Sequence, residues 1–468
     1  MDLKTTYIPC SPINTPNLPP STDSVPLADA SLIPMNVVQT ALCFDGALDE
    51  ERLKNAVQLL SGVWPTLAGR YEMSKVGEEY EFATQTLTLA QPFPTTHVVQ
   101  PSPGVFLPPL GENYHLPNHP DAHIFAIRLT TLLPSGNSFL GLQASHLIDG
   151  EVKRQLLKIL DAFYTHGEAA REKMYELAGC VLPTFFPHVG LLLPYDPIWN
   201  LLVERKGHRH DLSGIVSDVI AAAAQSVPVI IELHRSELAF LREKYQQDIA
   251  VKLSEQDALS AWWITLLKKV GVDVHRVMYA LPQLLPIPPL FPPILPSLAM
   301  HAVMPFHIPI PSSSSLCSTP ATPAEVAKTI REGLARLRAS PDETLRWISA
   351  GAYQMRQAAI EGKGYDLLPN DGEVSINSNL RVDMENIMDW QVSFGFSAHQ
   401  VAFHTFISLP NFLRVFRANS REGEEKGERV ELSFNVADEG VKKSLTEIVK
   451  EERRAWGKVG AGLGGFER

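Results

Sequence analysis

Residues 123–163 strongly limit the kind of fold that this chain can adopt. Two strand-like segments, "HIFAIRLTTLL" and "SFLGLQAS", are joined by the turn-forming residues "PSGN" at 134–137. The chain then enters "GEVKRQLLKILDAF", where apolar residues recur at helical spacing, so one face of a helix over 150–163 would hold Val152, Leu156, Ile159, Leu160 and Phe163. Strands that lead directly into an amphipathic helix indicate layered α/β structure.

The same mixture of helices and strands continues along the chain. The segment "LDEERLKNAVQLLSGVW" predicts a helix that Pro65 ends. Three further helices are predicted by capping boxes, in which a Ser or Thr precedes an acidic residue by three positions: Ser254 with Asp257, Thr322 with Glu325, and Ser340 with Glu343. The strands "EVSINSNL", "HQVAFHTFISL" and "RVELSFNVA" then precede a last helix near 438–455.

The length of 468 residues is too great for one hydrophobic core, so we expect two domains. The stretch 186–215 is polar and rich in loop-forming residues, and it is our candidate boundary. We therefore predict a first domain over 1–200, a crossover loop over 201–215 and a second domain over 216–468.

Composition excludes several classes of protein. A net charge of −11 disfavours broad binding to nucleic acids or anionic membranes. The four cysteines have no C-x-x-C spacing and the N-terminus has no signal-peptide pattern, so we expect a reducing, cytoplasmic location and no cysteine-built zinc site. The uncharged segment 277–324 contains ten prolines between Pro282 and Pro311, which exclude a membrane-spanning helix and predict an extended connection.

Two motifs resemble known sites but lack the context that those sites require. The glycines of "GAGLGGFER" have dinucleotide-loop spacing, but too few residues follow them to form a helix. His115, His119 and His123 have the spacing of metal ligands on a helix, which Pro117 and Pro120 would break. We expect no metal site and no permanently bound cofactor.

His146 is the strongest catalytic candidate. It follows the apolar strand "SFLGLQAS" and precedes Asp149 and Gly150, which allow a tight turn before the helix. An imidazole held in this way can take a proton from a hydroxyl or an amine near neutral pH. The other interpretation is a histidine that merely ends a strand.

Several segments together resemble the BAHD-type acyl-CoA-dependent acyltransferases, especially their fungal relatives. "SHLIDG" is similar to the H-x-x-x-D-G motif of that family, and "WPTLAGRY" is similar to its "fyPLAGR" turn. "LSEQDALSAWWITLL" resembles the helix after the crossover, and 376–403 occupies the place of the "D-F-G-W-G" region. The condensation-domain and chloramphenicol acetyltransferase group is a more distant resemblance.

The resemblance implies two similar chloramphenicol acetyltransferase-like domains, each a mixed β-sheet with flanking helices. An active-site channel would lie between them, and strand material near 374–405 would pack on the first domain. His146 would act as general base on an acceptor hydroxyl, or less readily an amine, that attacks acyl-CoA. Acyl-CoA would be a co-substrate and the acceptor a small secondary metabolite. We expect a monomer, with no nucleic-acid partner and no membrane span.

Other residues receive roles by their position in the resemblance. Asp149 and Gly150 would support the catalytic loop, and Asn377, Ser378 and Asn379 are candidates for binding the oxyanion or the acceptor. The second-motif residues Ser393, Phe394, Gly395 and Phe396 would be structural.

The sequence also departs from the family pattern. His146 and Asp149 are one residue closer than in the family, Ser393 replaces an aspartate, and no arginine occupies the family's usual place near "VMYALPQLL". The short spacing and the altered second motif leave open a relative that binds without turnover. A condensation-type enzyme with a carrier-bound acyl donor is the second alternative, and Ser145 before His146, where such enzymes usually have a doubled histidine, favours free CoA instead.

Overall fold

The computed structural model describes part of the chain, and every structural statement below concerns that part. The described residues are 3–9, 24–27, 37–44, 46–63, 70–74, 84–88, 93–100, 125–132, 138–145, 150–178, 209–210, 221–280, 305–310, 321–340, 343, 354, 357–358, 361, 363–365, 369, 371–378, 380, 398–402, 409–418 and 428–460.

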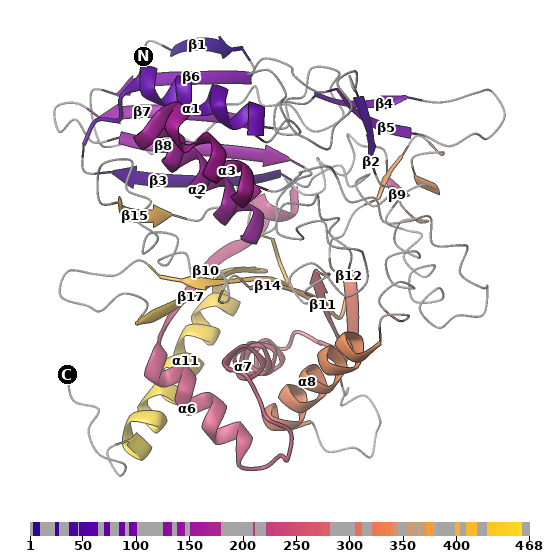
Figure 1. The fold of residues 1–468 in the computed structure, drawn as a ribbon. Coiled ribbons are helices and arrows are strands. Elements are labelled where there is room, and N and C mark those ends of the chain that lie inside the picture. The colour runs from indigo at the N-terminus through magenta and orange to yellow at the C-terminus, as the bar shows by residue number, and fades with distance from the viewer. Residues whose placement is uncertain are drawn as a thin grey trace.

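The first half of the molecule is built on a six-stranded mixed sheet with helices on one face (Figure 1). The strand order is β1-β6-β7-β8-β3-β15, and among these described strands β6 and β7 form the one parallel pair of neighbours. The strands are β1 (Leu3–Ile8), β3 (Val37–Phe44), β6 (Phe93–Gln100), β7 (Phe125–Leu132), β8 (Ser138–Ser145) and β15 (Ala398–Ala402). The helical segments are α1 (Glu50–Val63), α2 (Gly150–His166), η3 (Gly167–Ala170) and α3 (Arg171–Ala178).

Helix α1 begins and ends close to where the sequence predicts it, and its apolar face is buried. Leu53, Ala56, Val57 and Leu60 are at most 1% exposed. Helix α2 likewise buries Leu156, Ile159, Leu160 and Phe163, and it packs against α1. The helical spacing of apolar residues is thus confirmed where the side chains are described.

The second half contains another six-stranded mixed sheet, in the order β10-β17-β16-β14-β11-β12. Figure 1 shows its helices together on the side away from the first sheet. The strands are β10 (Val227–His234), β11 (Arg276–Ala280), β12 (Pro305–Pro309), β14 (Glu373–Ser378), β16 (Phe412–Arg417) and β17 (Arg429–Val436). The helices are α6 (Arg235–Gln246), α7 (Glu255–Lys269), α8 (Pro323–Ala339) and α11 (Glu439–Gly460).

Small sheets complete the described structure. One has the order β2-β5-β4, with β2 (Ser24–Leu27), β4 (Arg70–Ser74) and β5 (Thr84–Thr88). The other pairs β9 (Arg209–His210) with β13 (Gly364–Tyr365). Because β9 lies within the predicted crossover loop 201–215, that stretch includes a short strand.

Two of the predicted capping boxes are complete. In α7 the side chain of Ser254 accepts from the backbone N–H of Asp257, and Asp257 accepts from the backbone N–H of Ser254. In α8 the same exchange joins Thr322 and Glu325. Of the third, the structure describes the hydrogen bond from the Glu343 amide to the Ser340 hydroxyl, at 3.2 Å. Local side-chain chemistry therefore defines where these helices begin.

The predicted crossing segment 374–405 is divided between the sheets. Strand β15 pairs antiparallel with β3 at the edge of the first sheet. Strand β14 instead lies inside the second sheet, between β16 and β11. The expectation that strand material near residue 374 packs on the first domain is therefore corrected for β14, because β14 has hydrogen-bonded neighbours from the second half on both edges.

The ends of the proline-rich segment 277–324 are regular rather than merely extended. Strand β11 includes Val277–Ala280 and pairs with β12, which begins at Pro305. Residues 281–304 lie outside the described part. In the portion that is described, no helix is both long and apolar enough to cross a membrane.

Candidate active site

The predicted base is flanked by two well-anchored elements. Strand β8 is an interior strand of the first sheet and ends at Ser145, and α2 begins at Gly150. His146 and Asp149 are in the connection 146–149, which lies outside the described residues. The roles of His146 and Asp149 therefore stay predictions. That the strand and the helix hold this connection rigid from both ends is likewise a prediction.

The other candidate residues are near the end of β14. Asn377 and Ser378 are its last two residues, while Asn379 and the second-motif residues Ser393, Phe394, Gly395 and Phe396 lie outside the described part. Successive side chains along a strand point to opposite faces of a sheet. Asn377 and Ser378 therefore cannot serve the same site from the same face.

Ser378 lies on the face that the helices cover. Val374 and Ile376, which share its face, belong to the hydrophobic core with the apolar residues of α7 and α8. The Ser378 hydroxyl donates to Oε1 of Gln256 on α7, and Gln256 Nε2 donates to the Ser260 hydroxyl at 3.0 Å. Tyr279 donates to the same Ser260 hydroxyl at 3.3 Å. Ser378 thus joins a polar chain between the sheet and α7.

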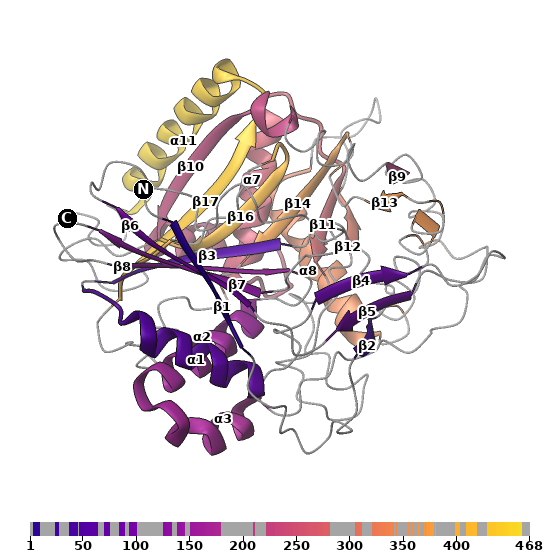
Figure 2. The ribbon, with the colours of Figure 1, turned by 90° about the horizontal axis from the view of Figure 1, so that it is seen from above.

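Asn377 lies on the opposite face, over which Figure 1 places none of the described helices of this half; we call it the helix-free face. This face of the second sheet includes Met278, Asn377, Arg414, Phe416 and Ser433. Figures 1 and 2 both place the first sheet on this side of the second sheet. Met278 and Phe416 are 2% and 8% exposed and lie outside the hydrophobic core cluster, so this face is covered as well.

Arg414 is a candidate that the sequence interpretation missed. It pairs in register with Asn377 on one side and with Ser433 on the other, and its guanidinium lies 5.6 Å from the centre of the Phe412 ring. The side chain is buried, and that burial lowers the pKa of Arg414 to about 10. The signal in the sequence is a single charge within "FLRVF", because an arginine inside an apolar strand requires polar surroundings.

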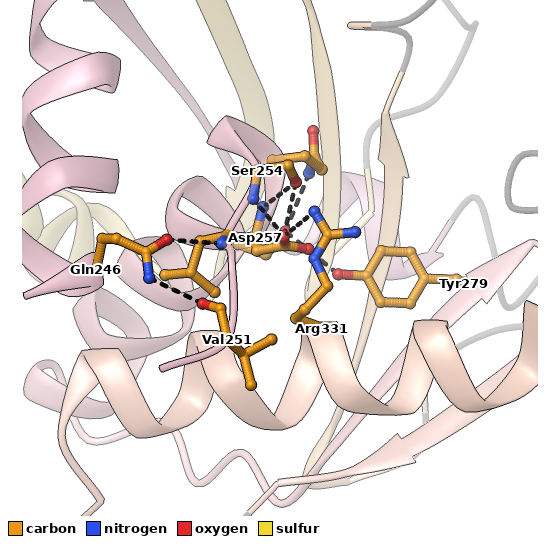
Figure 3. Close-up of polar contacts among 9 residues, drawn as sticks. Gln246, Val251, Ser254, Asp257, Tyr279 and Arg331 are labelled. Carbon is orange, nitrogen blue, oxygen red and sulfur yellow. Dashed lines mark hydrogen bonds and ion pairs between the residues drawn. The ribbon is translucent and has the colours of Figure 1, made fainter. Parts of the chain in front are cut away.

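A second polar cluster has a structural role. Figure 3 shows Asp257 at the start of α7, with Ser254, Tyr279 and Arg331 around it. Gln246 holds the α6–α7 connection by donating to the Val251 carbonyl at 2.9 Å and accepting from the Leu253 amide at 2.8 Å. These contacts fix α6, α7 and α8 together on the helix side of the sheet.

The helix side also contains a pocket of about 390 Å³. Tyr245, Trp262, Lys269, Glu452 and Trp456 are among its lining residues. Because α6, α7, α8 and α11 form it, the second sheet separates it from Asn377 and Arg414. This pocket is therefore not the predicted acyl-transfer site. No cluster of potential metal-ligating side chains occurs among the residues that are described.

Comparisons with known proteins identify the fold. No protein-family model and no curated protein matches the chain. Solved structures do: F. sporotrichioides TRI101 complexed with coenzyme A and T-2 has a TM-score of 0.65 and 14% identity, over 93% of this chain and 99% of that chain. F. graminearum TRI101 complexed with coenzyme A and T-2 mycotoxin has a TM-score of 0.64 and 12% identity, over 92% and 97%.

Vinorine synthase is similar over 95% of this chain and 96% of its own, with a TM-score of 0.56 and 14% identity. TRI101 and vinorine synthase are BAHD acyltransferases. The chain therefore has a BAHD-type, chloramphenicol acetyltransferase-like fold, and the predicted fold class is confirmed. At sequence identities this low, the structural similarity establishes the fold alone. The chemistry has to be argued from the residues of this chain.

Proposed function

We propose that this protein transfers an acyl group from acyl-CoA to a hydroxyl of a small acceptor molecule. The observation that carries the proposal is the position of the "SHLIDG" segment, which joins an interior strand to a buried helix in a fold shared with coenzyme A-bound TRI101. A histidine at such a junction suits proton transfer. The acceptor would be a secondary metabolite, and an amine is the less favoured acceptor group.

The reaction needs one base and no covalent enzyme intermediate. His146 would take the proton of the acceptor hydroxyl while its oxygen attacks the thioester carbonyl carbon. The resulting tetrahedral oxyanion would collapse with cleavage of the carbon–sulfur bond. The imidazolium would then return its proton to the sulfur, giving free coenzyme A and the ester.

Asn377 is the better-supported of the described candidates for a donor to the oxyanion or the acceptor. Its amide side chain shares the helix-free face with a buried arginine, whereas the Ser378 hydroxyl donates to Gln256 on the helix side. A preorganised amide N–H stabilises charge that develops in the transition state. Asp149 and Gly150 would keep the catalytic connection in shape.

The test measures release of coenzyme A from acetyl-CoA with a thiol reagent, with and without a panel of hydroxylated acceptors. We expect His146→Ala to lower kcat by about 10²–10⁴-fold and to leave coenzyme A binding nearly intact. His166→Ala is the control, because His166 is exposed at the far end of α2 and should behave as wild type. Normal turnover in His146→Ala would contradict the proposal.

The same assay separates the alternatives. A relative that binds without turnover would bind coenzyme A and release no thiol from acetyl-CoA. A condensation-type enzyme would use an acyl group on a carrier protein and ignore the free thioester. The shortened spacing between His146 and Asp149 and the altered second motif motivate the first alternative. Ser145, where a condensation-type enzyme usually has a second histidine, favours free coenzyme A over the second alternative.

A further inference from the structure

The pocket on the helix side of the second sheet has the size and the lining of a small-molecule site. Its volume of about 390 Å³ lies within the range of pockets that hold small ligands. Helices α6, α7 and α11 and the start of α8 form it. Its buried lining residues are Leu241, Tyr245, Trp262, Ala324 and Trp456. The interior of the pocket is therefore mainly apolar and aromatic.

The aromatic residues of the pocket are held in place by contacts with one another. The rings of Trp262 and Trp456 have centroids 5.7 Å apart, and the Trp456 ring lies 6.1 Å from that of Phe240. The Trp262 indole also donates to Oε2 of Glu452 at 2.6 Å. A lining that is already packed and hydrogen-bonded needs little reordering when a flat ring binds against it.

Tyr245 provides a hydrogen-bond donor for a ligand. The residue is 6% exposed and lines the pocket, and its hydroxyl has no hydrogen-bond partner within the described part of the chain. The equally buried Tyr279, in contrast, donates to the Ser260 hydroxyl at 3.3 Å. Burial and the negative charge of Glu452 raise the pKa of Tyr245, so its hydroxyl keeps its proton near neutral pH. A ligand with a hydrogen-bond acceptor would satisfy this donor.

The charges around the pocket favour a neutral ligand. Glu452 forms an ion pair with Lys269 on α7. The Glu452 carboxylate opposes an anion near the Tyr245 hydroxyl, and Lys269 opposes a cation. The other charged lining residues, Lys244 and Asp248, are exposed and opposite in sign. The pocket therefore has no excess charge that would select a charged ligand.

We propose that this pocket binds a small, neutral, planar aromatic molecule with a ring carbonyl that accepts a hydrogen bond from the Tyr245 hydroxyl. The ring of the ligand would lie against Trp262 and Trp456, because offset and edge contacts between aromatic rings are favourable. The second sheet separates the pocket from the helix-free face. The ligand is thus an additional one, and its binding does not depend on the proposed acyl transfer.

Equilibrium dialysis with two matched probes tests the inference. Coumarin is flat and neutral and has a ring carbonyl, whereas naphthalene has a similar shape and no acceptor. We expect Tyr245→Phe to raise the Kd of coumarin about 3- to 10-fold and to leave the Kd of naphthalene unchanged, because only the hydroxyl is lost. Tyr279→Phe is the control, since the Tyr279 hydroxyl is bound to Ser260 and should leave both affinities as in wild type.

A second variant tests the position of the bound probe. Ala455 is an exposed lining residue on α11, so Ala455→Trp should block the pocket and abolish binding of both probes with little change in Tm. Lys443→Trp is the matched control. Lys443 is exposed about two and a half helical turns before Glu452, on the opposite side of α11, and its substitution should leave binding unchanged.

The inference is overturned if neither probe binds wild type, which would mean that the pocket holds only water. Equal loss of both probes in Tyr245→Phe would show a structural role for the hydroxyl, and unchanged coumarin binding would show no role; either result contradicts the proposal. Displacement of coumarin by coenzyme A would place the probe in the acyl-transfer site and contradict it as well. Turnover of acetyl-CoA by Tyr245→Phe should equal that of wild type, so the two proposals fail or hold separately.

Discussion

Arg331 on α8 lies 2.7 Å from the Asp257 carboxylate on α7 (Nη2 to Oδ2), and the Asp257 side chain is 2% exposed. The same carboxylate oxygen also accepts hydrogen bonds from the amide and the hydroxyl of Ser254, at 2.7 Å each. One buried carboxylate thus begins a helix and joins it to a neighbouring helix (Figure 3).

Asp257→Asn should lower the free energy of unfolding by about 3 kcal/mol, because it leaves a partly buried Arg331 without its charge partner. Urea unfolding measures the loss. The control is Glu325→Gln, which alters the equivalent position of the α8 capping box where the carboxylate is exposed. We expect a smaller loss there, and equal losses would show that capping alone accounts for the effect.

Gly372→Ala should be among the most destabilising small substitutions in the second half. A Cβ at this position would lie 2.0 Å from Cε1 of His275, and the residue has a φ of +76°. Strain and overlap together should lower the free energy of unfolding by about 3–5 kcal/mol. Thermal unfolding followed by circular dichroism is the measurement.

Gly271→Ala provides the matched control for this substitution. Gly271 has a φ of +87°, but a Cβ added there would meet no atom within 4 Å beyond its chain neighbours. Only backbone strain remains at this position, so the expected loss is about 1 kcal/mol. Equal losses of unfolding free energy in the two variants would show that the His275 side chain moves aside and that the overlap at Gly372 costs no stability.

Asn377→Ala and Ser378→Ala should separate catalysis from stability. Asn377→Ala removes a donor on the helix-free face and should lower kcat by about 10²-fold. Ser378→Ala removes the hydrogen bond to Gln256 and should lower the free energy of unfolding by about 1 kcal/mol with kcat nearly unchanged. Steady-state kinetics and urea unfolding of both variants test this prediction. A large loss of kcat in Ser378→Ala with nearly normal kcat in Asn377→Ala would place the reaction on the helix side of the sheet.

Asp149→Asn should preserve the shape of the pH–rate profile. In our interpretation Asp149 supports the connection between β8 and α2 and transfers no proton, so its loss reduces the amount of folded, active protein. Measurement of kcat/KM across pH 5–9 tests this, with active-site concentration normalised by coenzyme A binding. A displacement of the apparent pKa by about one unit or more would make Asp149 part of the proton-transfer machinery.

The local parts of the fold could be predicted from the sequence because their signals are local. Two helix starts follow from capping residues three positions apart, and the buried faces of α1 and α2 follow from helical spacing. The two faces of β14 could not be assigned from the sequence. The alternation of side chains along a strand shows that Asn377 and Ser378 point to opposite faces of the sheet, but it does not show which of these faces the helices cover. Arg414 was missed for the same reason: its importance depends on neighbours 37 positions before it and 19 after it, which only the sheet register brings together.

The position of β15 has a consequence for how the protein is made. The edge strand of the first sheet is Ala398–Ala402, while the strand it pairs with, β3, ends at Phe44. A ribosome must therefore synthesise most of the chain before this sheet can be completed, and loop closure over that span is slow. During synthesis β3 would expose an unpaired edge, which is a template for aggregation. Expression should thus depend on chaperones and temperature more than the stability of the finished protein suggests.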